Sequence, residues 1–365
     1  MRNSVRSSIV TACVVATSLL TTIPADAATP GQLDRTFGGD GKQTTFNRGG
    51  TGYAVAIDAN GRIVVAGYTL TGQTDLAVAR FLPDGKPDKS FGGDGRVITD
   101  LGGTDYGFDV AIHPDGGIVV VGERDTRSGS RAAVVRYLPR GKRNKDFGGD
   151  GIVLTSFGKK YQGANAVVVS ADGNITIGGF TSNGSTAKWA MARYGPRGVL
   201  DKRFGGNGKV TVDLAPADEQ INDMVLAKGG GLVATGSASS GMTPRFAIAR
   251  FRPNGSLDKR FGHKGRNLVD VSKGSDIAFG LGQGSDGSLV AVGYAQNGKR
   301  DGWGLAAFGP KGRRDDRFGK DGVRVLQLGP QYEFAYDAHV QTNGKIVVVG
   351  RASRKSGGDE FGVFR

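Results

Sequence analysis

The side chains with the clearest capacity for recognition are aromatic rings that lie near arginines in the sequence. Such rings stack on sugar rings, and neighbouring guanidinium groups bind anionic groups. The sequence therefore favours a binding site for an anionic carbohydrate or cell-wall polymer, with another protein as an open alternative. The candidate ligand-binding residues are Trp189, Trp303, Tyr106, Tyr161, Tyr332, Arg124, Arg127, Arg300, Arg351 and Arg354.

Catalytic and metal chemistry have weaker support. The three histidines, His113, His263 and His339, form no close pair, and the single cysteine is Cys13. Zinc binding and a histidine-dependent triad are therefore not predicted. The aspartate-rich loops lack the ligand spacing of an EF-hand, although calcium in such a loop stays open. The sequence predicts no metal ligand, no cofactor and no catalytic residue.

One enzymatic alternative stays open, because the chain is rich in aspartate. A polysaccharide hydrolase or lyase would need two carboxylates that converge across one pocket. The candidates for that role are Asp105, Asp125, Asp218, Glu219, Asp301 and Glu333.

These side chains lie within a repeated unit. A Phe-Gly-x-x-Gly motif recurs six times at intervals of 54 to 57 residues, beginning at Phe37 and ending at Phe318. A Gly-x-x-Asp lead-in precedes five of the copies, and Asn144 replaces the Asp in the other. An arginine such as Arg80 also recurs, although Ala307 replaces it once. Because catalytic groups need occur only once, we interpret the recurring Arg and Asp as structural ion pairs.

Each unit alternates four short apolar runs with turn residues, which predicts four β-strands. In the first unit the runs are 53–58, 62–68, 76–82 and 96–101. Asn60-Gly61 between the first two is a strong signal for a tight hairpin. The second run of a unit is apolar without alternation, so both faces of that strand must be covered. Tandem four-stranded units of this length predict a β-propeller.

The chain ends indicate how the ring closes. Five complete sets of strands lie between residues 51 and 328, and a sixth set from residue 334 has only three strands. We expect residues 42–46 to supply the missing strand and close the ring. The predicted fold is an all-β, six-bladed propeller of four-stranded antiparallel blades, formed as one domain by residues 28–365.

The candidate ligand-binding residues fall in the loops from strand two to strand three and from strand four to the next blade. These loops share one end of a propeller and differ most between units, so we call this end the variable face. Trp189 and Trp303 begin third strands, and packing between blades is the alternative for both.

The repeats resemble those of the bacterial delta-60 repeat family. The likeness rests on Leu-Asp-x-x-Phe-Gly-x-x-Gly, Ile-Val-Val-x-Gly and Ala-x-Ala-Arg-Phe, and it extends over residues 31–365. The resemblance implies an exported β-propeller and brings no catalytic residue.

The first 27 residues predict export. Arg2 and Arg6 precede an apolar stretch, and Ala25 and Ala27 form a small-x-small cleavage pattern. Cleavage after Ala27 would leave a secreted chain without cysteine or a transmembrane segment, which we expect to be a monomer. The whole chain carries a net charge of +14, which suits an anionic surrounding. Because the basic residues are dispersed and the chain is exported, no nucleic-acid partner is predicted.

Overall fold

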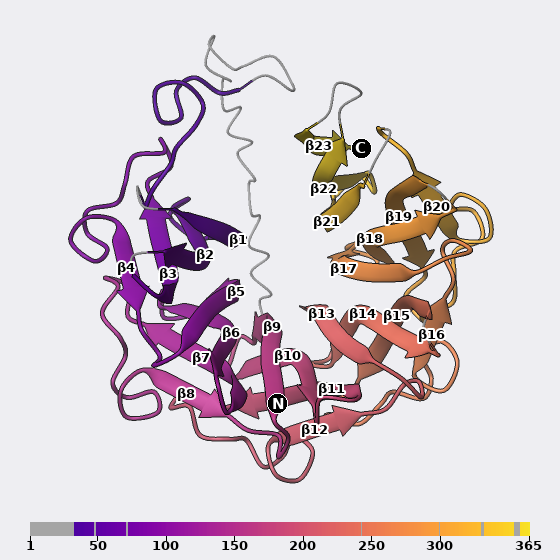
Figure 1. Cartoon of the computed structure of the whole chain (residues 1–365), viewed down its shortest axis with the longest axis horizontal. Helices are drawn as coiled ribbons and strands as arrows, with labels where there is room; N and C mark the ends of the chain where they lie inside the picture. The colour runs from indigo at the N-terminus through magenta and orange to yellow at the C-terminus, as the bar shows by residue number, and fades with distance from the viewer. Residues whose placement is uncertain are drawn as a thin grey trace, which may run out of the picture.

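Six antiparallel sheets form the blades of a propeller around a central axis (Figure 1). All regular secondary structure in the described residues is β-strand, as the sequence predicts. The predicted signal peptide lies outside the described residues. The computed structural model describes residues 33–46, 49–70, 72–241, 243–298, 300–329, 332–353 and 358–365.

Five blades contain four strands and the sixth contains three. Blades 1 and 2 are β1 (Gly50–Ile57), β2 (Ile63–Leu70), β3 (Thr74–Phe81), β4 (Arg96–Thr99), β5 (Thr104–Ile112), β6 (Ile118–Thr126), β7 (Gly129–Tyr137) and β8 (Ile152–Thr155). Blades 3 and 4 are β9 (Tyr161–Val169), β10 (Ile175–Ser182), β11 (Ala187–Tyr194), β12 (Lys209–Val212), β13 (Glu219–Leu226), β14 (Leu232–Ser240), β15 (Thr243–Phe251) and β16 (Arg266–Val269). Blades 5 and 6 are β17 (Asp276–Gln283), β18 (Leu289–Asn297), β19 (Arg300–Phe308), β20 (Val323–Leu326), β21 (Phe334–Val340), β22 (Ile346–Ser353) and β23 (Asp359–Phe364).

The innermost strand of every blade carries a β-bulge at the same position. A bulge leaves one residue without a partner and redirects its side chain. The bulged residues, in blade order, are Tyr53, Phe108, Asn165, Asn222, Phe279 and Tyr336. These strands surround the central axis, so the bulges fix which side chains line it.

The hydrophobic core lies between successive blades. Val119 and Val120 point to opposite faces of β6, and both are fully buried. This burial confirms that both faces of the second strand are covered, as its unbroken apolar pattern predicts.

The Phe-Gly motif joins each blade to the next. Phe204 is fully buried between blades 3 and 4, and the amide of Gly205 donates to the carbonyl of Asn254 at 2.9 Å. Gly255 has a φ of 83°, and a Cβ atom there would lie 2.9 Å from Cε2 of Phe204. Glycine is therefore required in the lead-in, because it accepts this backbone conformation and leaves room for the ring.

The recurring Arg and Asp form the predicted structural ion pairs. In blade 4, Nη2 of Arg250 lies 2.8 Å from Oδ2 of Asp258, whose side chain is 7% exposed. The unit that has Asn144 finds a substitute, because Arg136 pairs with Asp115 of the β5–β6 turn. The charge of the arginine is therefore balanced in both arrangements.

The predicted closure of the ring is not confirmed. Residues 42–46 are not a strand, and β23 pairs only with β22. The N-terminal segment instead lies on blade 1, where the amide of Gly38 donates to the carbonyl of Asp84 at 2.8 Å. Apolar side chains are exposed on both blades that border the open side of the ring in Figure 1, with Val55 at 64% and Phe361 at 82%.

Candidate functional site

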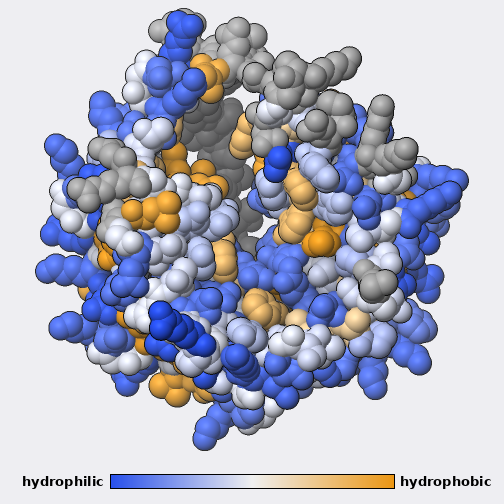
Figure 2. Space-filling model, viewed as in Figure 1, coloured by the Kyte–Doolittle hydropathy of each residue, from blue (hydrophilic) through white to orange (hydrophobic). Residues whose placement is uncertain are grey.

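The centre of the ring is a hollow with hydrophobic side chains on its walls (Figure 2). Two groups of aromatic rings occupy matching positions in blades 1–2 and in blades 5–6. The blade 1–2 aromatic group is Tyr53, Tyr68, Tyr106 and Phe108. The blade 5–6 aromatic group is Phe279, Tyr294, Phe334 and Tyr336. None of the eight rings is fully buried.

Each group contains one stacked pair of rings on the first strand of its second blade. The rings of Tyr106 and Phe108 are stacked, with centroids 5.6 Å apart and planes inclined by 8°. Phe334 and Tyr336 repeat this stack in blade 6, at 6.2 Å and 8°. Residues two positions apart in a strand face the same side of the sheet, which places the two rings of each stack together. Flat, partly exposed rings of this kind present surfaces on which planar or ring-shaped ligands can stack.

Two amides occupy the corresponding positions between the aromatic groups. Nδ2 of Asn165 donates to the carbonyl of Ile221 at 2.8 Å, and Nδ2 of Asn222 donates to the carbonyl of Ala278 at 2.7 Å. Each amide therefore also joins its blade to the next. The bulge positions around the ring thus read Tyr, Phe, Asn, Asn, Phe, Tyr.

Three aspartates follow the bulges on alternate blades, namely Asp109, Asp223 and Asp337. Oδ2 of Asp109 accepts a hydrogen bond from the amide of Val167 at 2.7 Å, one blade further on. Oδ2 of Asp223 accepts the equivalent bond from Leu281 at 2.7 Å. The first two carboxylates therefore help to hold blades together. Asp337 borders the open side and, in the described residues, makes no such bond.

These carboxyl groups ionise less readily than usual. Burial raises the pKa of Asp109 to about 7, and the charge of Asp337 adds to the rise. Burial also raises the pKa of Asp223 well above its ordinary value, and both other aspartates contribute. When they are ionised, the three groups place negative charge along the channel.

Two of the predicted ligand-binding residues are not at the surface. Trp189 and Trp303 are fully buried between blades. The indole Nε1 of Trp189 donates to the carbonyl of Ser237 at 3.1 Å, and that of Trp303 donates to the carbonyl of Arg351 at 2.9 Å. This finding corrects the prediction that these rings contact a ligand, because each fills the core between its own blade and the next.

The other predicted aromatic residues are divided between the channel and the rim. Tyr106 belongs to the blade 1–2 aromatic group. Tyr161 and Tyr332 are exposed near the variable ends of blades 3 and 6. Nζ of Lys160 lies 5.0 Å from the ring centroid of Tyr161. The structure does not gather these residues and Tyr106 into one cluster.

The predicted arginines are also dispersed. Cζ of Arg351 lies 5.7 Å from the ring centroid of Phe334, which places this guanidinium beside the blade 5–6 aromatic group. Nη1 of Arg124 lies 3.5 Å from the carbonyl of Leu101. Arg127 is exposed in the β6–β7 turn. The side chain of Arg300 and the whole of Arg354 lie outside the described part of the chain.

Three carboxylates considered for catalysis hold backbone amides instead. Asp105, Glu219 and Glu333 occupy the same position in their blades and are almost fully buried. Oε2 of Glu219 accepts from the amide of Leu214 at 2.9 Å, and Oε2 of Glu333 accepts from Leu328 at 2.7 Å. Burial raises the pKa of Glu219 to about 7 and that of Asp105 to about 6. Because the position recurs, we interpret these carboxylates as structural.

The remaining candidate acids do not converge on one point. Oδ1 of Asp218 accepts from the amide of Ala187 at 2.9 Å, and Asp301 hydrogen-bonds the hydroxyl of Tyr294. Asp125 is exposed on β6. The pair of facing carboxylates that a hydrolase needs is therefore not found among the predicted acids.

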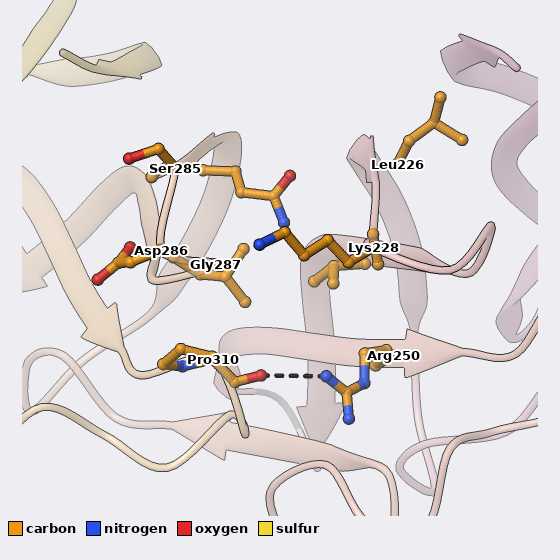
Figure 3. A pocket seen from close by; sticks show the side chains of 12 residues that line it. Leu226, Lys228, Arg250, Ser285, Asp286, Gly287 and Pro310 are labelled. Carbon is orange, nitrogen blue, oxygen red and sulfur yellow. Dashed lines mark hydrogen bonds between the residues drawn. The ribbon is translucent and has the colours of Figure 1, made fainter. Parts of the chain in front are cut away.

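A separate pocket opens on the face opposite the variable face, between blades 4 and 5 (Figure 3). Its volume is about 430 Å³, and its polar groups include Lys228, Ser285 and Asp286. Arg250 also lines it, but Nη1 donates to the carbonyl of Pro310 at 3.0 Å, and Asp258 balances the charge. The arginine is therefore committed to joining blades, and the pocket is a weaker candidate than the channel.

Sequence reasoning missed most of the channel residues. It weighed residues by their place in loops, whereas most of the channel rings lie on the first strand of a blade. The sequence does contain a signal for these residues. Equal intervals of two repeats separate Asp109, Asp223 and Asp337, and the bulge positions recur once in every repeat.

Comparison with known proteins identifies the class. Residues 59–91, 113–147 and 230–261 match the family described as "Domain of unknown function (DUF5122) beta-propeller". Each match runs from the first hairpin of a unit to the Phe of its Phe-Gly motif. These matches and the six-bladed fold support a β-propeller repeat family, in agreement with the resemblance to delta-60 repeat propellers.

Several solved structures are distantly similar to the chain. One is a protein of unknown function from Dyadobacter fermentans, with 15% identity, coverage of 87% of this chain and 95% of that chain, and a TM-score of 0.49. A catalytically inactive virginiamycin B lyase from Staphylococcus aureus has 10% identity, coverage of 88% and 94%, and a TM-score of 0.47. A gluconolactonase from Xanthomonas campestris has 14% identity, coverage of 84% of each chain, and a TM-score of 0.41.

At these identities the likeness concerns the fold alone. No curated protein matches the chain in sequence. Within the described ranges, no helix has the length and apolar character needed to cross a membrane.

Proposed function

We propose that the protein is an exported, non-catalytic binding module whose central channel accepts a sugar ring of a glycan. The observation that carries this proposal is the pair of matching aromatic groups on blades 1–2 and 5–6. Partly exposed tyrosine and phenylalanine rings offer apolar faces to the C–H face of a sugar, and tyrosine hydroxyls offer hydrogen bonds at the edges.

The state of the channel acids supports binding rather than catalysis. Asp109 and Asp223 each accept a backbone amide from the next blade through Oδ2, and through Oδ1 each accepts the amide of the following residue. A general acid or base must instead reach a ligand atom. The polysaccharide hydrolase or lyase that the sequence left open gains no support from its candidate acids, which hold backbone amides or lie apart.

The same acids refine the class of ligand. Negative charge along the channel repels an anionic polymer and tolerates a neutral or amino sugar. We therefore propose that an uncharged or amino-bearing ring enters the channel. Any anionic group of the same glycan would remain at the rim, where Lys160 and Arg127 are exposed.

The proposed location of the protein, outside the cell, rests on its amino-terminal sequence. Arg2, Arg6 and the Ala25–Ala27 pattern predict export, and cysteine occurs only at position 13. A chain cleaved after Ala27 would act outside the cell or at its surface.

The test is a binding screen of purified residues 28–365 against neutral, amino and anionic glycans and isolated wall polymers, at low and moderate salt. We expect binding that persists at moderate salt, because stacking on aromatic rings is not screened by ions. Tyr106→Ala and Phe334→Ala should each weaken it at least about tenfold, since one stacking contact contributes roughly 0.5–1.5 kcal/mol beyond the lost apolar area.

The matched control is Tyr161→Ala, which removes a partly exposed tyrosine from the rim and should leave binding unchanged. Binding that disappears at moderate salt, or that an inert basic protein reproduces, would refute the channel site and reduce the interaction to net charge. Release of shortened glycan products would favour the enzymatic alternative.

A further inference from the structure

Three carboxylates meet where blade 1 joins blade 2. Asp75 lies on β3, Asp100 directly follows β4, and Asp105 lies on β5. One oxygen from each lies within 4.8 Å of the others. Asp105 is fully buried, Asp75 is partly buried and Asp100 is exposed, so the cluster is closed on one side and open to solvent on the other.

A second feature shows that the cluster is incomplete. Oδ2 of Asp105 accepts a hydrogen bond from the amide of Leu101 at 2.5 Å. Oδ1 of the same carboxylate is buried and has no hydrogen-bond partner. Native proteins rarely leave a buried carboxylate oxygen without a partner, because removal from water is then uncompensated.

Blades 3 and 4 have a cationic side chain at the position of Asp75. In blade 3 the position of Asp75 is taken by Lys188, which forms an ion pair with Asp213 beside Glu219. In blade 4 it is taken by Arg245, whose Nε lies 3.8 Å from Asp270. Each of these blades therefore combines two carboxylates with one side-chain cation.

Blade 1 has a third carboxylate where the cation stands in blades 3 and 4. One cationic side chain is near, since Arg124 lies close enough to favour ionised Asp105. Its Nη1 is directed to the carbonyl of Leu101 at 3.5 Å, and its Nε has no hydrogen-bond partner in the described residues. Three carboxylates and one guanidinium leave two negative charges, which a divalent cation would neutralise.

We propose that Asp75, Asp100 and Asp105 bind a divalent metal ion, and that Ca²⁺ fits best. All three ligands are oxygens, which hard cations prefer. Ca²⁺ accepts oxygen ligands in a flexible geometry, whereas Mg²⁺ demands a near-ideal octahedron, so carboxylates from three separate segments suit the larger ion. Water can complete the coordination on the side of exposed Asp100.

This proposal revises the sequence-based prediction that the chain holds no metal. The ligands come from three different strands, and none belongs to a compact calcium-binding loop. Because Asp105 directly precedes Tyr106, a bound ion would also fix the start of β5 and hence the blade 1–2 aromatic group.

The experiment uses the purified protein after treatment with a chelator. Calorimetric titration with CaCl₂ should reveal one site per chain, saturated at about 1 mM Ca²⁺ or below, the range of weak extracellular calcium sites. Saturation should raise the melting temperature by a few degrees, because the ion binds only the folded chain. Mg²⁺ at the same ionic strength should have a smaller effect.

Variants distinguish specific coordination of Ca²⁺ by the three carboxylates from non-specific attraction of the ion to negative charge. Asp75→Lys copies the arrangement of Lys188, so it should abolish Ca²⁺ binding while the chelated variant melts at or above the wild-type temperature. Asp75→Asn should weaken Ca²⁺ binding at least about tenfold. The matched control Asp270→Asn removes the same charge from blade 4 and should leave Ca²⁺ binding intact. Lys188→Asp should add a second site.

Absence of binding at about 1 mM Ca²⁺ would overturn the proposal. So would Ca²⁺ binding that survives Asp75→Lys, or binding that Asp270→Asn abolishes. Equal responses to Mg²⁺ and Ca²⁺ would overturn the assignment to Ca²⁺. None of these results depends on whether a glycan binds the channel.

Discussion

The replacement Phe204→Ala tests whether the Phe-Gly motif holds neighbouring blades together. The ring of Phe204 is fully buried in the core between blades 3 and 4. Cζ of Arg193 lies 4.8 Å above its centroid, and Gly255 of the next unit packs against its edge. The backbone of Gly255 cannot easily move into the cavity that the replacement leaves, because the turn fixes its φ at 83°.

These contacts set the magnitude of the effect. A buried Phe→Ala replacement costs roughly 3–5 kcal/mol where the surroundings cannot collapse into the cavity. Loss of the cation–π contact with Arg193 adds about 0.5–1 kcal/mol, since this guanidinium is partly buried. We therefore expect a loss of about 3.5–6 kcal/mol in the free energy of unfolding.

Equilibrium unfolding in guanidinium chloride, followed by fluorescence, measures the change. Phe318→Ala provides a graded control within the same motif. Phe318 is only partly buried, so its replacement should cost about half as much. A loss below about 1 kcal/mol for Phe204→Ala would refute the idea that this ring joins blades.

Further predictions concern the channel, the open side of the ring and the lead-in glycines. Burial raises the pKa of Asp109 to about 7, so between about pH 4 and pH 7 the folded chain holds a proton that the unfolded chain has released. Stability should therefore fall as pH rises through this window, and Asp109→Asn should flatten the melting temperature against pH; an unchanged slope would contradict the assignment. If blade 6 closes on blade 1 in solution, Asp337 should accept the amide of Val55, as Asp109 accepts its counterpart one blade on. Hydrogen exchange should then show a protected Val55 amide that loses protection in Asp337→Ala, and fast exchange in the wild type would count against closure. Gly255→Ala should cost about 1–3 kcal/mol more than Gly206→Ala by denaturant unfolding, because both have positive φ but only the former brings Cβ against Phe204. Equal costs would show that strain at the ring is unimportant.

Sequence alone determined the repeat and most of its internal structure. The Asn60-Gly61 turn, the Phe-Gly motif and the four apolar runs depend on residues close together in the chain. They recur in each unit, so one unit supports the interpretation of the next. The pairing of Arg250 with Asp258 could be inferred for the same reason, because both positions recur and their charges need balance.

The assignment of single side chains was less successful, and Trp189 and Trp303 show why. Both lie at the start of a third strand, where neighbouring residues face either the next blade or solvent. A shift of one residue in strand register exchanges those two faces. In the structure Trp189 pairs with Phe180 and Val212, and this register places its ring in the core. The register cannot be derived from the sequence pattern alone.

Only the tertiary structure decided which residues share the channel and the cluster at blades 1 and 2. The two-residue alternation of β5 places Tyr106 and Phe108 on one face, but only the packing of blade 1 on blade 2 brings Tyr53 against the ring of Phe108. Asp75 and Asp100 are 25 residues apart and meet because β3 and β4 are hydrogen-bonded neighbours. Local patterns reveal the elements of a repeat, whereas a site is built from side chains that only strand pairing and blade packing bring within a few ångströms.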